Sequence, residues 1–253
     1  LYQHAETRLE ESPSIGELSI KNAADLPEFT GFDRYLYASG GARVEGAELT
    51  ATLIEASGFE KVEGRITLSP LDNGTYEINA QTFDKVILAC GAWLGQTLAP
   101  LGFEVDVRPQ KGQLRDYFFE GLDTGKLPVL MPEGELDVIP FAGGKISVGA
   151  SHENDQGFDL TVDETVLASL EEEAKTYFPD LSTAKSFSER VGTRAYTSDF
   201  SPFFGEVPEL ESVFVASGLG SSGLTTGPLI GKNLVELAMN RPGSLDSADY
   251  PVA

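Results

Sequence analysis

The residue pattern with the clearest chemical meaning is a glycine loop near the C-terminal end of the sequence. Residues 213–217 are apolar, and Gly218, Gly220 and Gly223 follow them in G-x-G-x-x-G spacing before a helix-like segment. At a strand-to-helix turn the first helical N–H groups are unpaired and together carry about half a positive charge. Glycines let a ligand approach such a backbone closely. The pattern therefore predicts a site for an anion or for the polar edge of a ring.

A dinucleotide is the first ligand to consider, but the sequence after this loop lacks the rest of the dinucleotide-binding pattern. That pattern needs a second strand with an Asp or Glu about 20 residues further on. Residues 241–253 are polar and contain two prolines, so Asp246 and Asp249 have no strand to carry them. We therefore expect the loop to meet a group other than the ADP part of a dinucleotide.

Arg194 is the second candidate. It lies between a small-residue turn and a segment that contains Asp199, and its planar guanidinium has the right geometry to bind a substrate carboxylate. A structural ion pair with Asp199, or a surface position, explains the same spacing. On spacing alone we favour the structural interpretation.

Other residue types that often carry catalysis give no comparable pattern. The single cysteine, Cys90, lies in an apolar segment without a cysteine or histidine near it, which is typical of an inert buried side chain. The two histidines, His4 and His152, lie near no candidate nucleophile or metal ligand, so we interpret both as solvated. The acidic run 171–173 is interpreted as a solvated helix face. The sequence predicts neither a metal site nor an acid–base dyad.

Length and composition predict a soluble globular protein. A chain of 253 residues with 41% hydrophobic content can bury a substantial core. No apolar run is long enough for a membrane span, and the first residues show no basic region followed by an apolar one, so we expect neither membrane insertion nor secretion. A single cysteine is compatible with a reducing compartment, so we expect a cytoplasmic protein. The net charge of −22 argues against nucleic acid as a partner.

The chain alternates between two kinds of strand pattern, one continuously apolar and one typical of antiparallel sheets. Residues 84–91 and 213–217 contain the unbroken apolar runs VILAC and VFVA, which predicts parallel strands covered on both faces. Between them, residues 105–151 read as short antiparallel strands at 127–132, 136–144 and 145–151, among others. We also expect helices over 1–12, 45–58 and 163–179, and a hairpin that turns at Asn73-Gly74. This interleaving favours two domains that share the chain.

Six segments, in this order and spacing, make the sequence similar to the FAD-dependent D-amino-acid oxidase superfamily, and within it to the glycine and sarcosine oxidase-like branch. They cover most of the chain and are residues 40–57, 84–98, 107–114, 139–151, 191–210 and 213–239.

The resemblance implies a mixed α/β fold in which the remainder of an FAD-binding three-layer domain is interleaved with an antiparallel-sheet substrate domain. Residues 1–42 and 106–192 would form the substrate-binding domain. Residues 43–105 and 193–243 would form the FAD-binding part, and 244–253 a C-terminal tail. In this family the ADP-binding G-x-G-x-x-G belongs to a first strand and helix that have no counterpart in this sequence. We therefore expect a C-terminal fragment that is impaired in cofactor binding.

The resemblance also assigns roles to particular residues. The glycine loop would pack against the flavin ring, with the helix N-terminus directed at its pyrimidine edge. Arg194 would bind the substrate carboxylate, which reverses the interpretation from spacing alone. The expected cofactor-binding residues are Ile66, Ala89, Cys90, Gly91, Trp93, Gly218, Gly220, Ser221, Ser222, Gly223, Leu224 and Thr225.

The implied reaction moves a hydride from the carbon that bears an amine to flavin N5, and dioxygen or another acceptor then reoxidises the flavin. Two positions depart from the family pattern: Ser221 stands where some members have a basic residue, and Asp137 where some have an aromatic one. The amine or amino acid is accordingly open. The alternatives are a non-catalytic binding or scaffold domain that keeps the fold, and a flavin-dependent dehydrogenase of glycerol-phosphate type.

Overall fold

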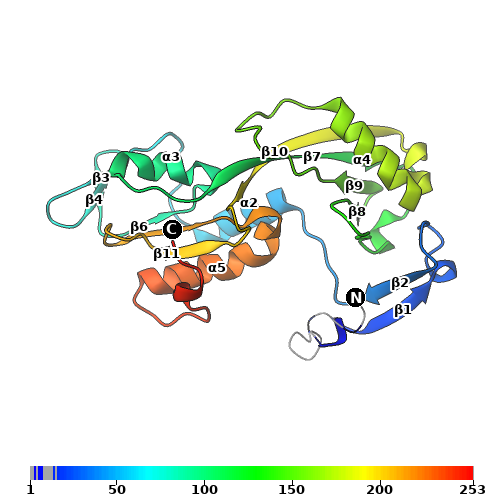
Figure 1. Ribbon diagram of the computed structural model, residues 1–253, viewed down its shortest axis with the longest axis horizontal. Helices are drawn as coiled ribbons and strands as arrows, with labels where there is room; N and C mark the ends of the chain where they lie inside the picture. Colours follow the sequence, from blue (N-terminus) through cyan, green and yellow to red (C-terminus); the bar gives the residue numbers. More distant parts are fainter. Residues whose placement is uncertain (1–2, 4, 8–13, 15, 253) are drawn as a thin grey trace. The chain divides into compact units, whose positions relative to one another are not determined.

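The computed structural model describes residues 3, 5–7, 14 and 16–252 (Figure 1). The helix expected over residues 1–12 falls largely outside the described residues, and so does His4. The chain divides into two compact units. Unit 1 consists of residues 1–49, 112–152 and 160–192, and unit 2 of residues 50–111, 153–159 and 193–253.

Unit 1 is built from two antiparallel sheets. The first pairs β1 (Leu18–Asn22) with β2 (Arg34–Ala38). The second has the strand order β10-β7-β9-β8, with the bounds Ser186–Tyr196 for β10, Arg108–Phe118 for β7, Lys145–Gly149 for β9 and Asp137–Phe141 for β8. Strands β7 and β10 continue past the division between the units.

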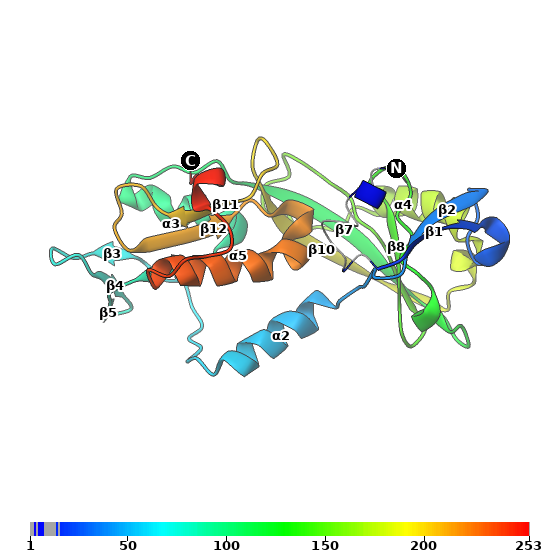
Figure 2. The same cartoon turned by 90° about the horizontal axis from the view of Figure 1, so that it is seen from below.

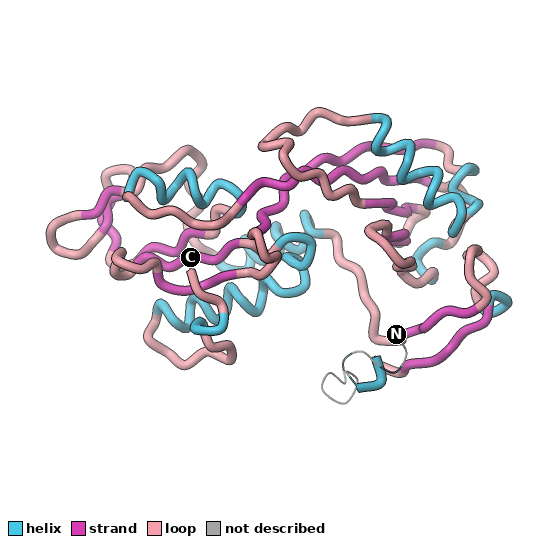
Figure 3. The backbone as a smooth tube through the Cα atoms, viewed as in Figure 1, coloured by secondary structure: helices cyan, strands magenta, loops and turns pink. Residues whose placement is uncertain are grey.

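Helix α4 (Glu164–Tyr177) covers one face of the four-stranded sheet (Figure 3). Val138, Ile146 and Val148 alternate along β8 and β9 onto this face and pack in one core with Ala174 of α4. Because successive side chains of a strand point to opposite faces, the residues between them lie on the other face. Covering one face leaves the sheet with an apolar side and a more polar side.

The N-terminus of α4 forms where the sequence predicts it. The Asp163 carboxylate accepts hydrogen bonds from the backbone N–H groups of Thr165 and Val166, at 2.9 and 3.3 Å. Its own backbone N–H donates to the Gln113 side chain on β7 at 2.7 Å. Such a cap satisfies helix N–H groups that otherwise lack a partner. It therefore fixes the helix start against the sheet.

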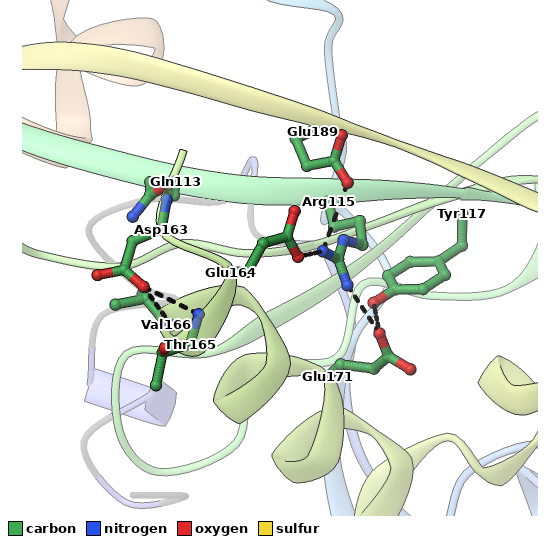
Figure 4. Close-up of polar contacts among 9 residues, drawn as sticks. All are labelled: Gln113, Arg115, Tyr117, Asp163, Glu164, Thr165, Val166, Glu171 and Glu189. Atoms are coloured by element: carbon green, nitrogen blue, oxygen red, sulfur yellow. Dashed lines mark hydrogen bonds and ion pairs between the residues drawn. The ribbon is translucent and has the colours of Figure 1, made fainter. Parts of the chain in front are cut away.

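A network of charged side chains also holds α4 against the sheet along the length of the helix (Figure 4). Arg115 on β7, only 5% exposed, donates to Glu164 at 2.7 Å and to Glu171 at 2.9 Å, and Glu189 on β10 lies 3.4 Å away. The Tyr117 hydroxyl donates to Glu171 at 2.9 Å. Glu171, expected from the sequence to lie on a solvated helix face, belongs to this network instead.

Unit 2 contains a three-stranded sheet in the order β11-β12-β6, from β11 (Phe203–Glu206), β12 (Val213–Ser217) and β6 (Val86–Leu88). Strand β12 is antiparallel to β11 and parallel to β6. A second small sheet joins β3 (Ser69–Pro70), β4 (Tyr76–Ile78) and β5 (Gln81–Phe83). The predicted hairpin at Asn73-Gly74 is the β3–β4 turn.

Helix α5 (Gly223–Ala238) lies against β11 and β12 (Figures 1 and 2). Further helices with described bounds, from both units, are α2 (Gly46–Ser57), α3 (Leu94–Leu98) and the 3₁₀ turns η2 (Ala23–Asp25), η3 (Gly91–Trp93), η4 (Ala99–Leu101), η5 (Thr124–Lys126), η6 (Pro179–Thr183), η7 (Gly220–Ser222) and η8 (Ser247–Asp249). Helix α2 has no buried residue.

Two expectations about strands are wrong. Strand β6 is not covered on both faces, because Ile87 is 42% exposed while Val86 and Leu88 are buried. Residues 127–132 form no strand but only an isolated bridge between Leu130 and Val138. The prolines at 128 and 132 have no N–H to donate to a ladder, which explains why pairing stops after one residue.

Candidate functional site

Unit 2 contains a cavity of about 550 Å³ at the carboxyl ends of its two parallel strands. Its volume lies within the range typical of small-molecule sites, about 300–1,000 Å³. The lining comes from the ends of β6, β10 and β12, from the glycine loop and from α5. The lining residues are Ile87, Ala89, Gly91, Thr193, Arg194, Ala195, Ala216, Ser217, Leu219, Gly220, Gly227, Ile230, Gly231, Leu234 and Val235.

The strand pairing places two loops side by side. Val213, Phe214 and Val215 of β12 pair in parallel with Val86, Ile87 and Leu88 of β6, so both strands end at the same edge of the sheet. The loop after each strand therefore starts at this edge. The Ser217 hydroxyl donates to the Gly91 carbonyl at 2.9 Å and ties the two loops together.

Two glycines give the cavity an open backbone. Gly91 has φ +55° and Gly220 has φ +53°, a left-handed conformation that favours glycine. A Cβ atom at either position would meet no other atom within 4 Å. The backbone at these two points faces open space, so a ligand can approach it directly.

Gly218 has a different role. It also has a positive φ, +75°, but a Cβ there would come within 2.7 Å of the Thr197 side chain and 3.1 Å of the Ser201 carbonyl. Asp199 holds this turn in place by accepting hydrogen bonds from the Thr197 hydroxyl and the Ser201 N–H, both at 2.9 Å. Gly218 therefore lets the turn pack against the glycine loop.

The N-terminus of α5 has no side-chain cap. Ser222 precedes the helix, but its hydroxyl donates back to the Leu219 carbonyl at 2.8 Å and caps no helix N–H. The first-turn N–H groups of a helix attract negative charge when nothing else satisfies them. The glycine loop and the start of α5 thus offer donors beside a cavity that Leu219 and Gly220 line.

Arg194 supplies the formal charge. Of the described residues that line the cavity, Arg194 alone carries a formal charge. Its sequence neighbours Thr193 and Ala195 also line the cavity. The rest of the lining is largely apolar and includes Ile230 and Leu234 of α5. An apolar cavity with helix N–H donors and one guanidinium suits a flat apolar ring or an anion.

The structure brings some of the predicted site residues together and separates others. Ala89, Gly91, Gly220 and Arg194 line the cavity, and Gly218 lies buried behind the loop. Cys90 packs against the core of unit 2. The residues that do not line it are Ile66, 40% exposed, Trp93, which stacks on Phe158 at 4.7 Å, Gly223, and the exposed Ser221, Ser222, Leu224 and Thr225.

Several lining residues were not predicted from the sequence. Gly227 and Gly231 stand one helical turn apart on α5, and both line the cavity. Their i, i+4 spacing was a readable signal, because residues four apart lie on one face of a helix. Ile87 was assigned to a covered strand, whereas its exposed face opens into the cavity.

Two other kinds of site are absent from the described part of the chain. No group of three or more His, Cys, Asp or Glu side chains is placed to hold a metal ion within residues 3–252 as described. Within the same residues, no helix has the length and apolarity that crossing a membrane requires.

Comparison with known proteins decides the family. The family model DAO, described as FAD dependent oxidoreductase, matches residues 4–237. The chain belongs to this family. The resemblance inferred from the six sequence segments is thereby confirmed, together with FAD as the cofactor and oxidoreductase as the class of enzyme.

Individual relatives agree with this membership. The uncharacterized oxidoreductase YurR of Bacillus subtilis is 34% identical over 99% of this chain and 71% of its own length. The glycine oxidase of Pseudomonas aeruginosa is 30% identical over 94% of the chain and 68% of its length. The crystal structure of iminodiacetate oxidase from Chelativorans sp. BNC1 is 29% identical, with a TM-score of 0.90 over 98% of this chain and 70% of that one. This structural match confirms the predicted mixed fold.

Proposed function

We propose that this protein oxidises the C–N bond of an amino acid or a secondary amine, with a hydride passing from the carbon that bears the nitrogen to flavin N5. The observation that carries the proposal is the cavity in unit 2. In a chain of the DAO family, it combines two open glycines, Gly91 and Gly220, with the cationic Arg194. Relatives named for oxidation of glycine and of iminodiacetate support an amine as the substrate.

The residues of the cavity fit a flavin ring. Apolar walls from Ile87, Ile230 and Leu234 suit its flat faces, and the open backbone at Gly91 and Gly220 suits close contact with its edges. When bound, FAD supplies the acceptor for the hydride. The uncapped start of α5 favours negative charge nearby, and a reduced flavin carries such charge.

The part left to the protein is orientation. Arg194 would hold a substrate carboxylate by two parallel hydrogen bonds, which fixes the direction of the C–H bond that breaks. The cavity walls would keep water away from the reacting atoms. Since the flavin accepts the electrons, no acid–base dyad is needed for the redox step. We further propose dioxygen as the final acceptor, a soluble cytoplasmic location, and residues 1–42 and 106–192 as the substrate-binding domain.

The test of the proposal uses the full-length protein reconstituted with FAD. We expect flavin absorbance, bleaching by a carboxylate-bearing amine without oxygen, and peroxide after oxygen is admitted. Arg194→Leu is expected to raise KM for that amine at least tenfold, which corresponds to about 1.4 kcal/mol. Arg241→Leu, an exposed arginine outside the cavity, is the matched control and should leave KM unchanged.

Two results would count against the proposal. A protein that stays colourless with FAD would favour the non-catalytic scaffold. Oxidation of a phosphorylated polyol instead of an amine would favour the glycerol-phosphate type of dehydrogenase. A phosphate dianion is best held by several cations, whereas Arg194 is the charged residue among the described lining residues.

A further inference from the structure

The lining of the cavity in unit 2 includes a hydroxyl group without a partner in the protein. Three lining residues carry polar atoms on their side chains, namely Thr193, Arg194 and Ser217. The Ser217 hydroxyl donates to the Gly91 carbonyl at 2.9 Å, and Arg194 is the residue proposed for the substrate carboxylate. Among the described residues, no hydrogen bond involves the Thr193 hydroxyl. This hydroxyl is therefore available to a ligand.

The position of Thr193 on β10 turns it towards the glycine loop. Successive side chains of a strand point to opposite faces, so Thr193 and Ala195 share one face and Arg194 lies on the other. Thr197, just past the end of the strand, packs so close to the glycine loop that a Cβ on Gly218 would lie 2.7 Å from its side chain. The side of β10 that carries Thr193 therefore faces this loop.

The two faces of β10 thus suit different ligands of the same cavity. The glycine loop and the uncapped start of α5 are the backbone groups proposed to meet the flavin ring. Thr193 lies on the face turned towards them and lines the cavity with them. Arg194 lines the cavity from the other face, where a substrate carboxylate can reach it. The hydroxyl of Thr193 is accordingly on the side of the cofactor.

A ring that fills the cavity removes water from Thr193. The side chain is partly exposed, so water can satisfy its hydroxyl before a ligand binds. A hydroxyl that loses this water without gaining another hydrogen bond is costly, so a ligand that pairs with it binds more tightly. Apolar walls such as Ile230 and Leu234 cannot pair with it, whereas the edge of a flavin ring carries nitrogen and oxygen atoms that can. Threonine is branched at Cβ, which also restricts where its hydroxyl can point.

We propose that the Thr193 hydroxyl donates a hydrogen bond to the polar edge of the flavin ring and stabilises the reduced ring more than the oxidised one. The proposal rests on the proposed function, which assigns the flavin to this cavity. A hydrogen bond to a charged group is stronger than one to a neutral group, and the reduced ring carries negative charge. The hydroxyl and the start of α5 then act on the cofactor together, while Arg194 acts on the substrate.

The experiment separates the hydroxyl of Thr193 from its methyl group. Thr193→Val keeps the shape of the side chain and removes the hydroxyl, whereas Thr193→Ser keeps the hydroxyl and removes the methyl group. In the full-length protein, FAD affinity is measured by flavin fluorescence, and the midpoint potential by equilibration with a reference dye.

We expect Thr193→Val to bind oxidised FAD at least threefold more weakly. Its affinity for reduced FAD should fall by a further factor of about five, which makes the midpoint potential about 20 mV more negative at about 30 mV per tenfold. Thr193→Ser should stay within twofold of the wild type in FAD affinity and keep its potential. Thr82→Val is the matched control, because Thr82 is an exposed threonine of β5 outside the cavity, and it should change neither quantity.

The outcomes distinguish this inference from the proposed function. An unchanged midpoint potential in Thr193→Val, or equal effects of the valine and serine variants, would overturn it even if the enzyme oxidises amines. A higher KM for the amine with unchanged FAD binding would also overturn it, because the hydroxyl would then face the substrate. The expected pattern in a protein that binds FAD but oxidises no amine would support the inference, and only the proposed reaction would fail.

A last measurement tests whether the hydroxyl serves the fold. Without FAD, Thr193→Val and the wild type should have equal melting temperatures, because the hydroxyl has no partner among the described residues. A clear drop in the melting temperature of the variant would assign the hydroxyl to the fold and contradict the proposal.

Discussion

Polar groups are paired in one region of the molecule and left open in another. The first region is the junction between α4 and its sheet in unit 1, and the second is the cavity in unit 2. At the junction, Arg115 is buried and surrounded by Glu164, Glu171 and Glu189, which act as its partners. In the cavity, the start of α5 is uncapped and two left-handed glycines face open space. Groups that satisfy one another stabilise a fold, whereas groups left without a partner are available to a ligand. The contrast separates the part of this protein that holds it together from the part that binds.

The largest expected effect comes from breaking the junction. Arg115→Leu leaves three carboxylates facing one another in a partly buried place, and removing one partner of such a network costs about 3–5 kcal/mol. We expect a loss of this size in the free energy of unfolding, measured by urea denaturation. Glu164→Gln, at the 71% exposed end of the network, is the control and should cost less than about 1 kcal/mol. Equal costs for both variants would show that the arginine is not the centre of the network.

A change in the cavity should act on the ligand more than on the fold. Gly220→Val places a branched side chain at φ +53° and in the open space beside the loop, so we expect FAD affinity to fall at least tenfold, about 1.4 kcal/mol. Gly58→Val is the matched control, because Gly58 has φ +64° and a Cβ there would meet no atom within 4 Å, yet it lies outside the cavity. Both variants carry similar backbone strain. If the two lose FAD equally, as measured by flavin fluorescence, strain alone accounts for the loss.

The smallest expected effect concerns how the stability that Glu171 contributes changes at acidic pH. Burial raises the pKa of Glu171, but hydrogen bonds from Lys175 and Tyr117 and the charge of Lys175 lower it, and the net pKa is below the usual value. A carboxyl whose folded pKa is depressed stabilises the fold above its unfolded pKa, and this stability is lost as pH falls through the folded pKa. We therefore expect Glu171→Gln to lose about 1 kcal/mol at pH 7 and less than that at pH 3. Urea denaturation at both pH values tests this prediction. Equal losses in the free energy of unfolding at the two pH values would contradict it.

Local elements were predictable wherever neighbouring residues decide them. The start of α4 follows from Asp163, whose carboxylate caps N–H groups two and three residues away. The hairpin follows from Asn73-Gly74, and the edge at which β6 and β12 end follows from two apolar strands that run parallel. The strand predicted over 127–132 does not form, because its two prolines have no N–H groups to donate to a neighbouring strand, whatever the apolar content of the segment.

The candidate site was predictable in part for the same reason. Gly91 and Gly220 stand directly after apolar strands, where sequence patterns are informative, and both line the cavity. Ser221, Ser222, Leu224 and Thr225 were assigned to the cofactor by their place in the same loop, but they are exposed and do not line it. Which residues of a turn face inward depends on backbone angles that spacing does not specify. Their role in binding FAD stays a prediction.

By itself, the sequence determined the family, the cofactor class, the caps and turns, and the glycine loop that ends beside a helix. Only the tertiary structure decided which charges meet: Arg115 reaches carboxylates 49 and 56 residues away, and Arg190 reaches Asp116 across 74 residues. The physical reason is range. Caps, turns and strand patterns depend on hydrogen bonds and side-chain directions within a few residues, whereas the partner of a charge depends on how distant strands are brought together.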